Sequence, residues 1–231
     1  MKIFCDSASV DEIKKYTQDE TITGFTSNPT LMKKAGITDY LDFARQAVEA
    51  SSGKPISFEV FSTEVSEMRR QAKLLSQLGK NVYVKITPNN YDGSSLLELI
   101  RELSYDGVQL NVTAVFTLNQ VNKICESINP DTPCIISIFS GRIADAGVDP
   151  EPIITESKSI AMSRSNKWEI LWASPREVFN IIQAERSGAD IITATPDILV
   201  KRKSFGKDLE KFSLETTRMF IDDAKSAGYE L

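Results

Sequence analysis

Short apolar runs alternate with longer amphipathic segments from one end of the chain to the other. The longer segments carry apolar residues at three- and four-residue spacing, as Met68, Ala72 and Leu75 do, and this spacing predicts helices at Thr63–Leu78 and Ser94–Leu103. The short runs predict strands. These are Lys2–Cys5, Ile22–Thr26, Ile56–Phe58, Val82–Val84, Val108–Asn111, Ile135–Phe139, Glu169–Trp172 and Ile191–Thr195.

The eight strand–helix units predict an α/β protein with a single (β/α)8 TIM barrel over residues 1–231, because this alternation is typical of a parallel sheet covered by helices. An open doubly wound sheet is the structural alternative, but no GxGxxG or GxxxxGK[ST] turn supports a nucleotide role. No Gly/Ser-rich or Pro-rich linker divides the chain. The amphipathic segment 208–226 predicts an additional C-terminal helix, either for docking onto a partner or as the last helix of the barrel.

Composition narrows the chemistry that this fold can carry. The chain has 231 residues, 41% of them hydrophobic and 26% charged, as in globular proteins. Its net charge of −5 argues against a nucleic-acid partner, because such proteins cluster Lys and Arg against phosphates. The absence of histidine excludes Ser–His and Cys–His nucleophile pairs and histidine-bound zinc. Acid–base chemistry therefore falls to Asp, Glu, Lys, Tyr or Cys.

The sequence also carries indications of location and redox state. The segment MKIFCDSASV lacks the apolar core of a signal peptide, and no apolar stretch reaches the length of a membrane helix. We therefore expect a cytoplasmic protein that does not contact a membrane. Cys5, Cys125 and Cys134 are widely spaced and odd in number, which fits neither a disulfide framework nor a CxxC metal knuckle. We expect three reduced thiols.

Polar residues follow the predicted strands at the end where parallel barrels carry their reacting groups. Each alone is weak evidence, because a strand that returns to solvent usually ends in a polar residue. In chain order they are Asp6, Asn28, Glu59, Lys85, Asn111, Thr113, Ser137, Arg142, Ser174 and Arg176.

Lys85 directly follows the predicted strand Val82–Val84. Such a lysine is ordinarily a solvated strand terminus. Inside a barrel mouth, however, desolvation and neighbouring cations favour the neutral amine, which attacks carbonyl groups. Asp6 and Glu59, which could equally be loop charges or helix caps, would supply carboxylates for proton transfer. Together the three residues suffice for imine formation in a protein without histidine.

Arg142, Ser174 and Arg176 follow the predicted strands nearest the end of the chain. They could simply be surface residues at helix starts. A guanidinium, a hydroxyl and a helix N-terminus are also what a sugar phosphate requires, because each donates hydrogen bonds to oxyanions. Barrels often place a phosphate near their late strands. The aromatic Phe139 is predicted to pack in the barrel and to shape the pocket.

Seven motifs, in the order of the predicted strands, resemble the transaldolase family, and the chain's length and spacing resemble its small-subunit branch, which includes fructose-6-phosphate aldolase. Together they are specific, because ordered motifs are far harder to reach by chance than a single one. They are Ile3–Asp6 (IFCD), Gly24–Thr30 (GFTSNPT), Phe58–Val60 (FEV), Asn81–Ile86 (NVYVKI), Asn111–Thr113 (NVT), Ser137–Ile143 (SIFSGRI) and Leu171–Arg176 (LWASPR).

The resemblance implies a role for each strand-end residue. Lys85 would form the Schiff base, and Asp6 would move protons during carbon–carbon cleavage and addition. Glu59 and Thr113 would hold and activate the water used in imine formation and hydrolysis. Asn28 and Asn111 would bind the dihydroxyacetone unit or position the lysine, and Ser137 and Phe139 would contact the substrate. The distal phosphate would be held by Arg142, Ser174 and Arg176.

The implied function is transfer of a dihydroxyacetone unit from a ketose phosphate, such as fructose 6-phosphate or sedoheptulose 7-phosphate, to an aldose phosphate, as in the pentose phosphate pathway. No metal or organic cofactor is needed, because the protonated imine is itself the electron sink. In the family, Glu at position 59 with Phe at position 139 marks transaldolases, whereas Gln with Tyr marks aldolases that release dihydroxyacetone. Glu59 and Phe139 therefore favour transfer.

Other functions stay open at this point. One is an aldolase of the same branch, another a variant acting on an unusual sugar, and a third a sugar-phosphate-binding barrel whose lysine never forms an imine. Departures from the family pattern bear on the acceptor: Ser204–Asp208 replaces a His-Pro-Leu-Thr-like stretch, Pro175 separates Ser174 from Arg176, and Asp145 stands one residue late. The branch forms ring-based decamers, so we expect a homo-oligomer of that kind.

Overall fold

The computed structural model describes residues 1–230, and Leu231, the last residue of the predicted barrel range, lies outside the described residues. Eight parallel strands close into a barrel in chain order, and the last strand pairs with the first. This confirms the predicted TIM barrel. The strands are β1 (Lys2–Asp6), β2 (Ile22–Thr26), β3 (Ile56–Glu59), β4 (Val82–Ile86), β5 (Leu110–Val115), β6 (Cys134–Ile138), β7 (Trp168–Trp172) and β8 (Ile191–Ala194).

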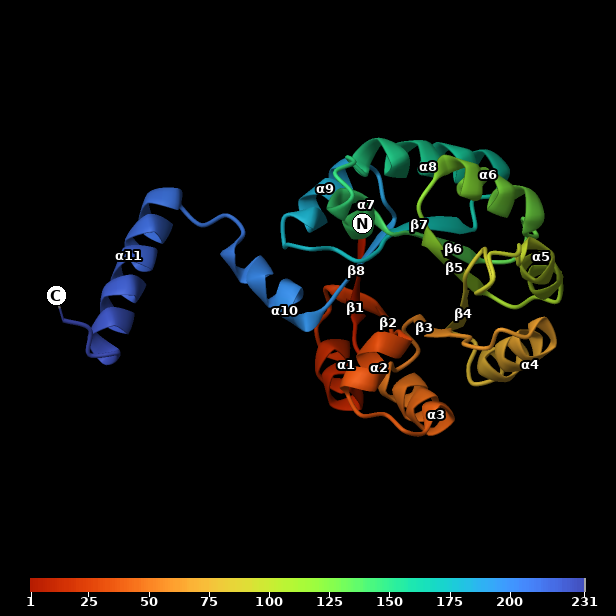
Figure 1. The fold of residues 1–231 in the computed structure, drawn as a ribbon, viewed down its shortest axis with the longest axis horizontal. Coiled ribbons are helices and arrows are strands. Elements are labelled where there is room, and N and C mark those ends of the chain that lie inside the picture. The colour runs from red at the N-terminus through yellow and green to blue at the C-terminus, as the bar shows by residue number, and fades with distance from the viewer. Residues whose placement is uncertain (231) are drawn as a thin grey trace. The chain divides into compact units, whose positions relative to one another are not determined.

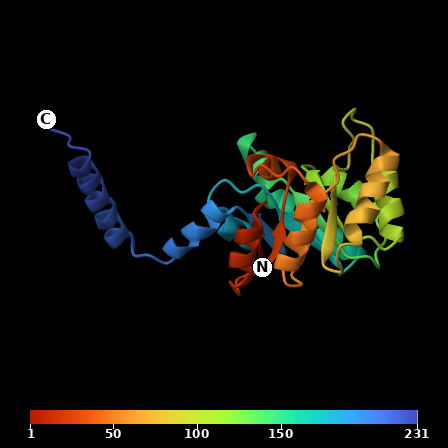
Figure 2. The ribbon, with the colours of Figure 1, turned by 90° about the horizontal axis from the view of Figure 1, so that it is seen from below.

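Helices surround this ring of strands, as the view along the barrel shows (Figure 1). In the side view of Figure 2 the N-terminus lies at the lower end of the barrel, and the strands run from there toward the opposite end. The helices are α1 (Val10–Thr17), α2 (Pro29–Lys34), α3 (Tyr40–Ala50), α4 (Val65–Ser76), α5 (Leu97–Tyr105), α6 (Leu118–Ser127), α7 (Ser140–Asp145), α8 (Glu151–Arg164), α9 (Asn180–Arg186) and α10 (Pro196–Leu199).

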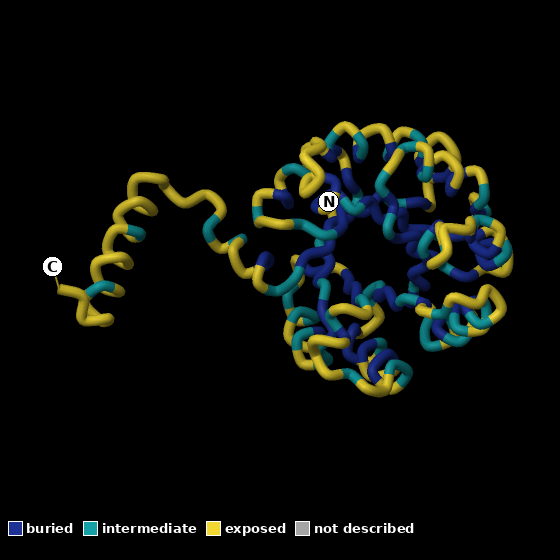
Figure 3. Tube along the Cα trace, viewed as in Figure 1, coloured by how far each residue is buried: buried dark blue, intermediate teal, exposed yellow. Residues whose placement is uncertain are grey.

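The barrel buries two separate apolar layers. The larger lies between strands and helices, where α4 contributes Met68, Ala72 and Leu75 at the predicted spacing. In Figure 3 the barrel wall is accordingly dark, and the outward sides of the helices are exposed. A smaller cluster fills the space inside the ring of strands, as in other barrels. It consists of Phe4, Ile135, Leu171, Ala173 and Ile191, with Tyr83 and Phe139 packed against it.

Most predicted strands end within two residues of the observed ones, but β5 differs more. It runs from Leu110 to Val115 and not over Val108–Asn111, so Thr113 lies inside the strand and not after it. The predicted helix at Ser94 begins only at Leu97, because the Asp92 carboxylate accepts a hydrogen bond from the Ser94 N–H and holds a turn there.

A close approach of main chains brings α7 to the end of β7. A Cβ atom on Gly141 would lie 1.6 Å from the carbonyl oxygen of Ser174, so only glycine fits. The Gly141 N–H also donates to the Ala173 carbonyl at 3.3 Å. Because Arg142 follows Gly141 directly, this contact places its side chain and that of Ser174 at one corner of the barrel mouth.

The described residues from 200 onward form a second compact unit, distinct from residues 1–199. Its described part contains a 3₁₀ helix (Val200–Ser204) and α11 (Leu209–Ser226), which confirms the predicted C-terminal helix. The Asp208 side chain caps α11 by accepting a hydrogen bond from the Lys211 N–H. Within the described residues α11 buries no side chain (Figure 3). Its docking role stays a prediction.

Candidate active site

A pocket of about 500 Å³ lies at the carboxyl ends of the strands. Arg176 is the one predicted site residue that does not line it. Those that do are Asp6, Asn28, Glu59, Lys85, Asn111, Thr113, Ser137, Phe139, Arg142 and Ser174. The structure therefore gathers residues from the first to the seventh strand segments around one cavity, as barrel catalysis requires.

Lys85 is buried at this site, with 7% of its surface exposed. Its Nζ donates to the Ser27 carbonyl at 2.8 Å and lies 3.0 Å from the Glu59 carboxylate. The partners that the structure describes are thus a carboxylate and a carbonyl, and not the neighbouring cations considered from the sequence. β4 sets this geometry, because Lys85 stands in register with Glu59 on β3 and with Asn111 on β5.

β5 contributes two polar side chains to the pocket. Asn111 is fully buried, donates from Nδ2 to the Ser57 hydroxyl at 3.1 Å and accepts from the Ser137 hydroxyl at 2.6 Å. Thr113 lies two residues later on the strand and is also buried, so both point to the same side. The pairing with β6 shifts register just beyond, where Ala114 has φ 55°. Neighbouring hydroxyls fix the Asn111 amide rigidly at the pocket wall.

Asp6 ends β1 and is held by two donors from β2 and its following turn. The Thr26 hydroxyl donates to its carboxylate at 2.7 Å and the Asn28 amide at 3.2 Å. Since the single Thr26 proton is used there, the Thr193 hydroxyl at 2.6 Å must donate to Thr26. This relay orients the Asp6 carboxylate toward the pocket.

The pKa of Asp6 is raised, and loss of hydration by burial is the largest cause. The Lys85 charge and the hydrogen bonds from Thr26 and Asn28 lower the pKa, and the Glu59 charge raises it, so burial outweighs the stabilising contacts. Part of the Asp6 surface still faces the pocket. A carboxyl with a raised pKa can exchange a proton with substrate nearer to neutral pH.

Two aromatic side chains lie close to the Arg142 guanidinium at the pocket. The guanidinium carbon of Arg142 lies 5.6 Å from the centre of the Phe139 ring, a cation–π arrangement. Phe139 in turn contacts Phe116, with ring centres 5.8 Å apart. Both rings and Arg142 line the pocket.

Arg176 is engaged by an acidic neighbour instead of facing the pocket. Its Nε donates to both oxygens of the Asp145 carboxylate at 3.0 Å, its Nη2 also bonds Asp145, and its Nη1 donates to the Ser174 hydroxyl at 3.1 Å. The Arg176 hydrogen bond holds the pKa of Asp145 below its usual range. The predicted phosphate role of Arg176 stays a prediction.

Comparison with known proteins agrees with this geometry. A family model described as transaldolase/fructose-6-phosphate aldolase matches residues 3–231. The chain belongs to this family. It is therefore related to aldolase-type enzymes of sugar phosphates.

Several relatives match along nearly their whole length. The chain is 35% identical to a probable transaldolase of Chelativorans sp. (strain BNC1) over 215 residues, 92% of this chain and 94% of the relative. It is 34% identical to a probable transaldolase of Nitrosopumilus maritimus (strain SCM1) over 228 residues, 93% and 97% of the two chains. With a probable transaldolase of Ruegeria sp. (strain TM1040) the identity is 31% over 231 residues, covering both chains fully.

The pocket of this family member also depends on residues that the sequence did not predict. Thr26 lies within the GFTSNPT motif at the end of β2, and this position could have indicated that it belongs to the site. Thr193 and Ser57 are polar residues within apolar strands, which by alternation can face the barrel interior. Ser27 acts through its carbonyl, a group that residue type does not reveal.

The three cysteines do not line the pocket. All three cysteines are buried free thiols, and burial raises the pKa of Cys5 and Cys134, and that of Cys125 to about 12. Residues 1–230 hold no group of three or more His, Cys, Asp and Glu side chains placed to share a metal ion. Among the helices of the described chain, none combines the length and hydropathy that a bilayer crossing demands.

The raised pKa of Asp6 predicts a particular dependence of stability on pH. The folded protein binds this proton more tightly than the unfolded chain, so the associated stability is fully present below the ordinary aspartate pKa and is lost as pH rises through the raised one. Asp6→Asn removes the titration. We expect wild-type protein to lose stability relative to Asp6→Asn across that interval, measured as urea midpoints at successive pH values.

Asp222→Asn on α11 serves as the control, because it removes an exposed carboxylate that is not among the residues lining the pocket. Its stability difference from wild type should not follow the Asp6 trend. A wild-type protein that instead gained stability relative to Asp6→Asn with rising pH would show that the Asp6 pKa is lowered.

Proposed function

We propose that this chain is a transaldolase that forms a Schiff base at Lys85. It transfers a dihydroxyacetone unit from fructose 6-phosphate or sedoheptulose 7-phosphate to an aldose phosphate. The observation that carries the proposal is a buried lysine amine in the barrel mouth, 3.0 Å from a carboxylate. Lysines are almost never buried without such a purpose or partner.

Imine formation uses Lys85 with Glu59. The Glu59 carboxylate takes a proton from Lys85 Nζ, and the free amine then attacks the C2 carbonyl of the ketose. The carbinolamine loses its hydroxyl as water, with the proton supplied by Glu59. Thr113, buried in the same pocket wall, offers a hydroxyl to hold that water.

Carbon–carbon cleavage uses Asp6. Its carboxylate accepts the proton of the C4 hydroxyl as the C3–C4 bond breaks, and the bonding electrons move to the protonated imine to give an enamine. The aldose phosphate leaves, an acceptor aldehyde enters, and Asp6 returns the proton as the new bond forms. The raised pKa of Asp6 supports this role, because the group must both take and give a proton.

The same proposal includes the location, pathway and assembly of the enzyme. The enzyme acts in the cytoplasm, in the sugar-phosphate exchange of the pentose phosphate pathway. It works without a cofactor or nucleic acid, and it assembles as a homo-oligomer through α11, whose Phe212 and Phe220 are exposed.

Transfer is favoured over release of dihydroxyacetone by the residues around the enamine. Phe139 lines the pocket with an apolar ring that offers no donor or acceptor for a proton relay. The enamine is therefore protonated slowly and waits for an acceptor. A tyrosine at this position would supply the missing hydroxyl.

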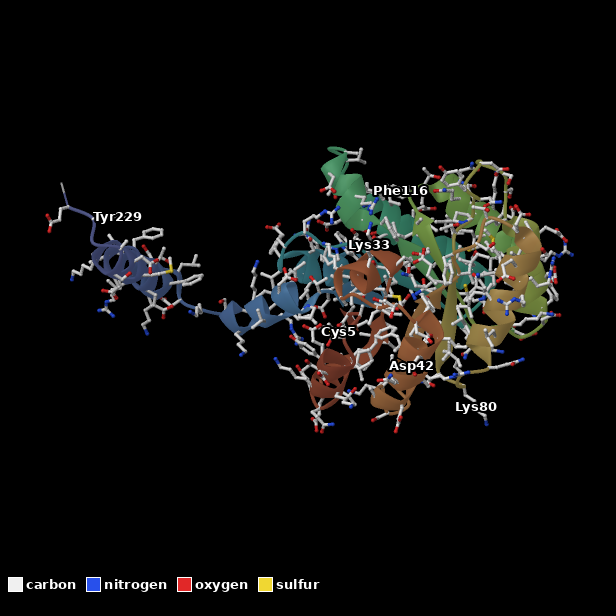
Figure 4. The ribbon with its side chains drawn as sticks, turned by 60° about the horizontal axis from the view of Figure 1, so that its bottom comes forward. Cys5, Lys33, Asp42, Lys80, Phe116 and Tyr229 are labelled. Atoms are coloured by element: carbon white, nitrogen blue, oxygen red, sulfur yellow. The ribbon has the colours of Figure 1, made fainter. Side chains whose placement is uncertain are left out.

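The Schiff base is tested by trapping. Borohydride reduction with fructose 6-phosphate, followed by peptide mass spectrometry, should place the adduct on Lys85. Lys85→Arg should abolish it, whereas Lys80→Arg, at the exposed Lys80 before β4 (Figure 4), should leave it intact. An adduct on another lysine, or none with any ketose tested, would refute the proposal.

The ion pair between Asp145 and Arg176 predicts opposite effects for its two partners. Asp145→Asn should free the guanidinium and lower KM for fructose 6-phosphate about two- to fivefold, the range for an exposed pair. Arg176→Ala should raise that KM about tenfold or more. Neither should change KM for fructose. Equal effects on both sugars, measured in steady-state assays, would remove Arg176 from the phosphate site.

Phe139→Tyr tests the preference for transfer. Wild-type protein should transfer the three-carbon unit rapidly to erythrose 4-phosphate and release dihydroxyacetone slowly without an acceptor. The variant should shift this ratio toward release, and Phe116→Tyr controls for a hydroxyl elsewhere in the pocket. If wild-type protein releases dihydroxyacetone as fast as it transfers, the chain is an aldolase.

A further inference from the structure

The main chain at the end of β3 lacks a strand partner on one side. The Phe25 N–H donates to the carbonyl of Pro55, just before β3, at 2.8 Å, and the Ser27 N–H donates to that of Ser57 at 3.2 Å. In a parallel ladder the next such donor comes two residues later. That residue is Pro29, which has no N–H and begins α2. β2 therefore has no donor for the Glu59 carbonyl.

A side chain from α3 takes the place of the missing strand. The Tyr40 hydroxyl donates to the Glu59 carbonyl at 2.7 Å and accepts from the Glu59 N–H at 2.8 Å. Tyr40 is half-buried, and its ring lies 5.0 Å from that of Phe61. Burial raises the pKa of its hydroxyl, so the proton stays in place for the bond to the carbonyl.

The same hydroxyl changes what Ser27 can do. A continued ladder would direct the Glu59 N–H to the Ser27 carbonyl. Because Tyr40 accepts that N–H, the Ser27 carbonyl is available to Lys85 Nζ, which donates to it at 2.8 Å. Both protein partners of the Lys85 amine thus depend on one tyrosine.

We propose that Tyr40 is a positioning residue for the reaction at Lys85, a role that rests on the function proposed above. Its hydroxyl fixes the main chain of Glu59, which sets the position of the carboxylate 3.0 Å from Nζ. It also leaves the Ser27 carbonyl free to orient the amine. Tyr40 does not line the pocket, so it acts through Glu59 and Ser27 and not on the substrate.

Tyr40→Phe removes only the hydroxyl and keeps the ring against Phe61. We expect kcat to fall about tenfold with KM for fructose 6-phosphate nearly unchanged, because imine chemistry and not binding is affected. The rate of borohydride trapping at Lys85 should fall in parallel. Tyr105→Phe, at an exposed tyrosine that ends α5, should behave as wild type.

Two further variants separate positioning from a purely structural role. Phe61→Leu loosens the packing of the Tyr40 ring but keeps the hydroxyl, so it should lower the urea midpoint while kcat stays near wild type. In a Glu59→Gln background, Tyr40→Phe should lower kcat little further, because the two act through one group. All assays are run below the unfolding temperature of each variant.

The outcomes distinguish the two proposals. If wild-type protein forms no Lys85 adduct, the proposed function fails. If wild-type protein forms the adduct and Tyr40→Phe turns over and traps at the wild-type rate, the Tyr40 proposal alone fails. It also fails if Phe61→Leu loses as much kcat as Tyr40→Phe, or if the effects of Tyr40→Phe and Glu59→Gln simply add.

Discussion

An amine kept out of water needs partners for its protons, and the barrel mouth is arranged around this requirement at Lys85. Burying an unpaired ammonium costs several kcal/mol even after relaxation, so the Glu59 carboxylate and the Ser27 carbonyl are conditions for placing Lys85 there. In the function proposed above, the same carboxylate takes a proton from the amine. Stability and chemistry thus depend on one contact.

Several features of the fold converge on that contact. β2 ends early because Pro29 begins α2, which leaves main-chain groups of Ser27 and Glu59 without a strand partner. Tyr40 from α3 satisfies those of Glu59, and the register of β3, β4 and β5 sets Glu59, Lys85 and Asn111 in one row. The apolar cluster around Phe4 and Leu171 closes the barrel interior beneath. The groups proposed to react are therefore held toward the carboxyl ends of the strands.

The sequence predicted the parts of this arrangement that depend on residue type and spacing. Alternating apolar runs located the strands, and polar residues at their ends identified Asp6, Glu59 and Lys85, because parallel strands bring their carboxyl ends together. The Ser27 carbonyl could not be found in this way, since every residue has one. The contact of Tyr40 with Glu59 spans 19 residues and depends on where α3 packs.

The charge pairing of Arg142 and Arg176 was equally hard to predict from the sequence. Arg142 and Arg176 look alike in sequence, but Arg142 lies over Phe139 in the pocket whereas Arg176 pairs with Asp145 beside it. Asp145 departs from the family pattern by one residue. Its pairing with Arg176 became evident only from the structure, where Asp145 ends α7. Residue type does not show which arginine faces the pocket and which pairs with Asp145, so only the tertiary structure distinguishes them.

The most direct measurement is a crystal structure of wild-type protein reduced with borohydride in the presence of fructose 6-phosphate. The account predicts continuous density from Lys85 Nζ to C2 of the sugar, with the Tyr40–Glu59 hydrogen bonds retained. Asp6 should lie beside the C4 hydroxyl of an intact adduct, or beside C3 if the C3–C4 bond has been cleaved. Sugar bound in the pocket with Lys85 still bonded only to Glu59 and Ser27 would contradict it.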